Sequence, residues 1–123
     1  MTPNFKKEEL ACKCGCGFLP KPDFIEKIQH LRERYGRAMP VTSAARCSDH
    51  NAKVSGTGRS GPHTTGRAID IAVSGGDAIE LIRLALVLGF TGIGVNQKGS
   101  GRFIHLDDLP SGINRPRPYL WSY

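Results

Sequence analysis

Residues 61–73 read GPHTTGRAIDIAV, and this stretch decides the fold because it sets a carboxylate inside an apolar run. Its proline and two glycines disfavour a helix, so it predicts a loop that carries His63, followed by a strand over 67–73. Alternate residues of a strand share a face, so Asp70 points away from the core side that its two flanking isoleucines occupy. Burying a charge without a partner is costly. We therefore expect a partner for Asp70.

A second run, RFIHLD at 102–107, also alternates and predicts another strand, with His105 on one of its faces. If this strand lies beside the first, His63, Asp70 and His105 converge. Two imidazoles and one carboxylate are a common catalytic zinc set that leaves a fourth position open for water. The spacing alone leaves a competing interpretation open, in which Asp70 pairs with an arginine or caps a loop and both histidines are ordinary polar residues.

The rest of the chain predicts an α+β fold, in which helices pack on a small, mostly antiparallel sheet. Further helices are expected over 23–35, 48–54 and 78–88, and further strands over 40–44 and 91–96. Asp77 with Glu80 resembles a capping box for the third helix. QKGSG at 97–101 predicts a hairpin loop. We expect the proline-rich tail, 108–123, to wrap the domain and to be anchored by Trp121.

Size and charge narrow the class of protein. A chain of 123 residues fits one domain, 1–123. The net charge of +6 favours an anionic partner, but no stretch interleaves clustered lysine or arginine with aromatic residues, so no nucleic acid is expected. No apolar run is long enough for a membrane span, and the N-terminus lacks the apolar core of a secretory signal. We expect a monomer that is synthesised in the cytoplasm.

The run PHTTGRAIDI resembles the S-x-H-x-x-G-x-A-x-D signature of the zinc D-alanyl-D-alanine peptidases. This family includes carboxypeptidases and phage L-alanyl-D-glutamate endolysins, and it shares its fold with the hedgehog signalling domain. FKKEELACKCGCG, VTSAARCSDHN, GIGV, FIHLD and the terminal WSY resemble a small single-domain branch of the family in the same order.

The resemblance implies a Zn²⁺ ion held by His63, Asp70 and His105, and a peptidase that acts on peptidoglycan stem peptides. Arg46, in AARCSDHN, matches the family arginine that binds substrate near the metal. His50 lies four residues later and is a candidate for the same cleft. Without a secretory signal, such an enzyme is expected to reach the cell wall after release or as part of a phage particle.

Two departures from the family pattern bear on the chemistry. Gly61 stands where the family has a serine, and Ser60 is the candidate substitute one place earlier. Many members place a glutamate general base shortly before the last histidine, but NQKGSGRFI contains no acid. Asp107, the nearest carboxylate on the same face as His105, is predicted to be the base or to orient a histidine ring. If no base exists, the alternative is a non-catalytic zinc module that binds cell-wall or protein ligands.

Four cysteines form a second pattern. Cys12, Cys14 and Cys16 crowd into CKCGCG, and Cys47 follows the candidate substrate arginine. Three explanations stay open: a disulfide from the N-terminal group to Cys47, a structural zinc held by the thiolates, and free thiols. The C-x-C spacing is tighter than the usual C-x2-C knuckle, so spacing does not favour zinc.

Overall fold

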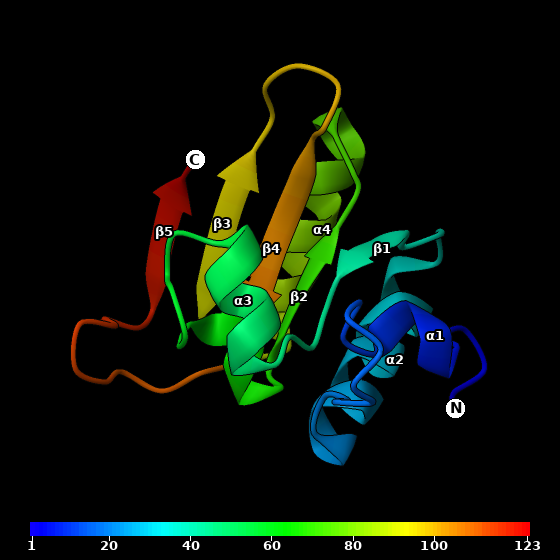
Figure 1. Cartoon of the computed structure of the whole chain (residues 1–123). Coiled ribbons are helices and arrows are strands. Elements are labelled where there is room, and N and C mark those ends of the chain that lie inside the picture. Colours follow the sequence, from blue (N-terminus) through cyan, green and yellow to red (C-terminus); the bar gives the residue numbers. More distant parts are fainter.

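A five-stranded sheet forms the centre of the computed structural model, which describes residues 1–123 (Figure 1). The strands lie in the order β1-β2-β4-β3-β5. Their bounds are β1 (Val41–Ser43), β2 (Ala68–Ile71), β3 (Gly92–Asn96), β4 (Phe103–Asp107) and β5 (Tyr119–Ser122). Every pairing is antiparallel except that of β3 with β5. The predicted α+β class and mostly antiparallel sheet are therefore confirmed.

Four α-helices and one short 3₁₀ helix accompany the sheet. They are α1 (Lys7–Leu10), α2 (Pro22–Tyr35), α3 (Ser48–Val54), the 3₁₀ helix η1 (Pro62–Thr65) and α4 (Gly75–Val87). The helix predicted over 23–35 corresponds to α2, which ends at Gly36 in the left-handed conformation that favours glycine. None of the helices combines the length and the apolar character that crossing a membrane requires.

Two local predictions are wrong. The capping box of Asp77 with Glu80 does not form, because α4 begins at Gly75 and places Asp77 inside the first turn. Asp77 pairs instead with Arg37, and Glu80 pairs with Arg83. The tail does not simply wrap the domain, since its last residues form the edge strand β5.

The two faces of the sheet have different roles. On one face, isoleucines and leucines of β2, β3 and β4 pack with the apolar sides of α2 and α4 into one core. These sheet residues are Ile69, Ile71, Ile93, Ile104 and Leu106. The alternation of strand residues turns Asp70 and His105 to the opposite face, where α3 lies in front of the sheet in Figure 1. The polar residues predicted to converge therefore share the face that the core does not use.

Candidate metal centre and cleft

The three predicted metal ligands come together. Asp70 on β2 is the register partner of His105 on β4, and η1 brings His63 against both. Asp70 Oδ1 lies 3.2 Å from His63 Nε2 and 3.1 Å from His105 Nδ1. One ligand atom from each residue lies within 4.8 Å of the others, and all three residues are buried.

The local backbone explains how His63 reaches a strand that begins only a few residues later. η1 is followed by Gly66, whose φ of +76° is the left-handed conformation that glycine adopts without strain. The chain can therefore reverse at once into β2. Gly66 also lies close to Lys21: a Cβ on it would lie 3.3 Å from the Lys21 nitrogen, and its carbonyl accepts a hydrogen bond from the Lys21 N–H at 2.9 Å.

The outer nitrogen of each imidazole has a partner that fixes the ring. His63 Nδ1 lies 2.6 Å from the backbone oxygen of Ala44, and His105 Nε2 lies 2.8 Å from Asp107 Oδ2. A carbonyl and a carboxylate only accept hydrogen bonds, so both outer nitrogens carry protons and the inner nitrogens can offer lone pairs. Metal-binding histidines are supported in this way in proteins. The donor set and its support thus fit zinc, with His63 Nε2, His105 Nδ1 and an Asp70 oxygen as ligands.

The electrostatics of the three residues are coupled. Burial raises the pKa of Asp70, but hydrogen bonds from His105 and His63 outweigh it and hold the pKa below the ordinary value. Burial lowers the pKa of His105, but its bonds to Asp107 and Asp70 outweigh that effect and raise the pKa. Without a metal, the raised pKa of His105 favours its charged form beside Asp70 and Asp107. A divalent cation would replace the proton on its inner nitrogen.

Asp107, a predicted candidate for the general base, is not among the residues that line the cleft. Its carboxylate is fully buried and accepts a bidentate pair from Arg117, Nε to Oδ1 at 2.9 Å and Nη2 to Oδ2 at 2.8 Å. Burial raises its pKa, but the bonds from His105 and Arg117 lower it to about 2. It contacts the outer nitrogen of His105, on the side of the ring away from Asp70, whereas a base must reach the reacting water. Its contact with His105 is the one expected for the other predicted role, in which Asp107 orients the ring.

Two glycines of β3 make room for this arrangement, and neither was among the predicted site residues. A Cβ on Gly92 would lie 2.3 Å from both Asp107 oxygens, and a Cβ on Gly94 would lie 2.8 Å from the Trp121 indole. Trp121 on β5 crosses Gly94, and its ring centroid lies 4.9 Å from that of His105. The two glycines in GIGV could have indicated this arrangement, because a glycine inside a strand often marks a place where another group packs closely against the backbone.

Arg46 is fixed with its guanidinium at the site. Nε donates to Ser43 Oγ at 3.0 Å, Nη1 donates to Asn51 Oδ1 at 3.0 Å, and Nη2 lies 3.6 Å from Asp70 Oδ2. Asn51 is only 1% exposed, and its amide nitrogen donates to Thr57 Oγ1 and to the Gly58 carbonyl. Asn51 was not among the predicted site residues, although it lies in the same AARCSDHN motif as Arg46.

These residues line a cleft of about 920 Å³. Its walls come from α3 and the following loop, η1, β4, the tail and β5. Among the lining residues are Arg46, Asn51, Ser60, His63, Asp70, His105, Arg115, Arg117, Tyr119, Trp121 and Tyr123. Asp70 is the only carboxylate in the lining, which contains three arginines.

The two remaining predicted substrate residues differ in position. Ser60 is exposed and lines the cleft. His50 is not among the residues that line the cleft, whereas Asn51 and Val54 of the same helix are. A substrate contact by His50 therefore stays a prediction, which the lining of the cleft does not support.

Comparison with known proteins agrees with this geometry. A family model described as Peptidase M15 matches residues 3–107. No curated protein and no solved structure matches the chain. The matched range includes His63, Asp70 and His105, and it ends before Arg117 and Trp121. The match spans most of the chain, so the protein belongs to the peptidase M15 family of zinc-dependent metallopeptidases.

Proposed function

We propose that the protein hydrolyses peptide bonds in the stem peptides of bacterial peptidoglycan, as a D-Ala-D-Ala carboxypeptidase or an endolysin-type endopeptidase. The observation that carries this proposal is the convergence of His63, Asp70 and His105 at an open cleft of about 920 Å³. A Zn²⁺ ion bound by two imidazoles and one carboxylate polarises a peptide carbonyl and lowers the pKa of its water to about 7.

The charges of the cleft support an anionic peptide as substrate. Arg46 Nη2 makes only the 3.6 Å contact to Asp70, so it is the guanidinium nitrogen available to a ligand. It would donate to a substrate carboxylate or to the oxyanion that develops at the attacked carbonyl. Arg115 adds positive charge to the same lining, and Ser60 adds a hydroxyl. Stem peptides carry free carboxylates and suit such a surface.

A second candidate function is the non-catalytic zinc module that binds cell-wall or protein ligands. One observation favours it: no carboxylate other than Asp70 lines the cleft, so the general base glutamate of many relatives has no structural replacement. Both functions predict zinc binding, and only hydrolysis separates them.

The test is digestion of purified peptidoglycan by zinc-loaded protein, followed by mass spectrometry of the products. A carboxypeptidase releases single D-alanine residues, whereas an endopeptidase creates new amino termini within the stem. Arg46→Met should keep zinc and lose about 10²–10³-fold in kcat/KM. Arg34→Met is the control, because it removes an exposed arginine that does not line the cleft. If wild-type protein with a full complement of zinc binds the wall and cleaves nothing, the binding module is the correct function.

The proposal also includes where and in what form the protein acts. We propose a monomer, made in the cytoplasm, that meets the cell wall after release or as part of a phage particle and does not use nucleic acid as a partner. Sedimentation of the purified protein tests the monomer. Fractionation of particles and lysates with a specific antibody tests the location.

A further inference from the structure

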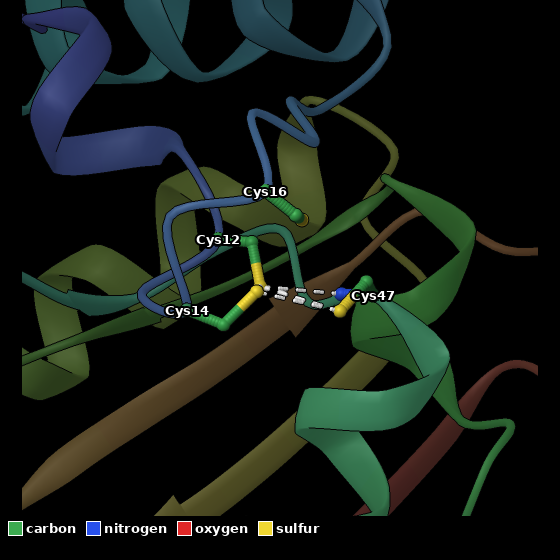
Figure 2. A group of neighbouring side chains, drawn as sticks. All are labelled: Cys12, Cys14, Cys16 and Cys47. Carbon is green, nitrogen blue, oxygen red and sulfur yellow. Dashed lines mark hydrogen bonds between the residues drawn. The ribbon is translucent and has the colours of Figure 1, made fainter.

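Four cysteine thiols gather at one point (Figure 2), and none of the four cysteines lines the cleft. Cys12, Cys14 and Cys16 lie in the loop between α1 and α2, and Cys47 is the residue that precedes α3. The sulfur of Cys12 lies 3.4 Å from that of Cys14 and 3.8 Å from that of Cys47. The sulfurs of Cys14 and Cys47 are 3.6 Å apart, and all four lie within 4.8 Å of one another.

These separations match the geometry of a metal–thiolate site. Zinc binds thiolate sulfur at about 2.3 Å in a tetrahedron, which places neighbouring sulfurs about 3.8 Å apart. A disulfide would bring two sulfurs to about 2.05 Å and leave the others unexplained. The four cysteines are free thiols, and the three measured pairs are nearly equidistant. We propose that Cys12, Cys14, Cys16 and Cys47 bind a second, structural Zn²⁺ ion.

The tight C-x-C-x-C spacing does not prevent this site, because the loop is coiled. In an extended strand, Cys12 and Cys16 would lie about 13 Å apart. Here Gly15 and Gly17 have φ angles of +86° and +88°, which permit the chain to turn sharply. The Cys12 N–H donates to the Phe18 carbonyl at 2.9 Å, which closes the loop. The coil therefore directs the three thiols to a common centre.

Backbone N–H groups point at two of the sulfurs and favour the thiolate form, which is the form that binds metal. The N–H of Cys47 lies 3.4 Å from the sulfur of Cys12, and the N–H of His50 lies 3.4 Å from the sulfur of Cys47. Such outer contacts orient metal ligands and stabilise their charge. Four protein ligands leave no open position, so this zinc is structural and takes no part in hydrolysis.

The thiolate site lies next to the segment that positions residues of the cleft. Cys47 directly follows Arg46, and the backbone N–H of Ala45 donates to the carbonyl of Leu10 at 3.2 Å. Ala44, whose oxygen holds His63, belongs to the same segment. The thiolate zinc therefore ties the N-terminal loop to the segment that positions both the substrate arginine and one ligand of the first metal.

The experiment measures metal content and the spectrum of the cobalt-substituted protein, purified under reducing conditions without chelator. Wild type should hold two zinc ions per chain, and His63→Ala should hold one. With Co²⁺ replacing zinc, His63→Ala should keep the sulfur-to-metal charge-transfer band. The double variant Cys14→Ser with Cys16→Ser should lose that band. Lys13→Ser is the matched control, because it alters the same exposed loop and removes no thiol.

The outcomes are decisive without any assay of hydrolysis. If the double variant does not fold, the band in His63→Ala alone decides the question. A single zinc that disappears completely in His63→Ala would overturn the proposal. So would a mass lower by two hydrogens together with only two titratable thiols in the denatured protein, since that result identifies a disulfide.

Discussion

Replacing Arg117 with methionine removes the charged partner of a fully buried carboxylate while it keeps an apolar side chain beside Trp121. Arg117 donates to both oxygens of Asp107, at 2.9 and 2.8 Å, and only 5% of its side chain is exposed. In the variant, Asp107 keeps its bond from His105 and loses its permanent positive partner. The carboxylate must then be protonated or stay buried with too little compensation.

The magnitude follows from the geometry. At an effective dielectric constant of about 20, unit charges 2.8 Å apart attract by about 6 kcal/mol, and desolvation of the pair offsets part of that. Breaking a buried pair from one side costs about 3–5 kcal/mol. We therefore expect Arg117→Met to lower the free energy of unfolding of the metal-free protein by that amount. Zinc affinity should fall by about tenfold or more, because His105 is held less firmly.

The assay is urea denaturation of metal-free protein, with zinc affinity measured by competition with a chelator. Arg115→Met is the matched control, since Arg115 lines the same cleft and pairs with no carboxylate. The double variant Arg117→Met with Asp107→Asn should recover part of the lost stability, because the unpaired buried charge is gone. If Arg117→Met is as stable as Arg115→Met, the assignment of Asp107 as a buried, arginine-paired support for His105 is refuted.

Three further predictions concern the surroundings of the site. Gly94→Ala should cost about 1–3 kcal/mol in urea unfolding by displacing the indole on β5, whereas Gly101→Ala, with open space around it, should cost little. Asn51→Ala should reduce kcat/KM, because Arg46 loses its 3.0 Å anchor, and a zinc titration should show unchanged metal binding. Burial raises the pKa of Tyr35 above its ordinary value of 10.0. The stability that comes from keeping the buried hydroxyl neutral is therefore complete below pH 10 and is lost as the pH rises through the pKa of Tyr35 in the folded protein. Tyr35→Phe should reduce the dependence of the unfolding free energy on pH above pH 10, as measured by urea unfolding.

The central pair of strands could be predicted because two independent regularities coincide. Alternation puts Asp70 and His105 opposite their apolar neighbours, and one register joins them once the strands are adjacent. The helices α2 and α4 follow from apolar spacing in the same way, although α4 begins three residues before the predicted start at 78. Such patterns are local, so a single sequence can reveal them.

The supports of the metal ligands could not be predicted in this way. The group that fixes His63 is the backbone oxygen of Ala44. Every residue has a backbone oxygen, so the residue type gives no indication of this contact. The partner of Asp107 comes from a tail that carries no periodic pattern, and only folding places Arg117 beside β4. Strand alternation specifies the face on which the Asp107 carboxylate lies, but not which nitrogen of His105 it contacts, so the sequence left both predicted roles of Asp107 open.

Different parts of the chain hold the two imidazoles in place, and these parts connect the tail and the cysteine loop to the cleft. His105 is held through Asp107 by a residue of the tail, whereas His63 is held by the segment that ends at Cys47. Loss of thiolate zinc should therefore loosen His63 and Arg46 and leave His105 in place. Loss of Arg117 should do the reverse. Histidine ring NMR signals in the two variants separate these effects: the Cys14→Ser with Cys16→Ser protein should broaden the His63 signals, and a uniform change at both rings would contradict separate supports.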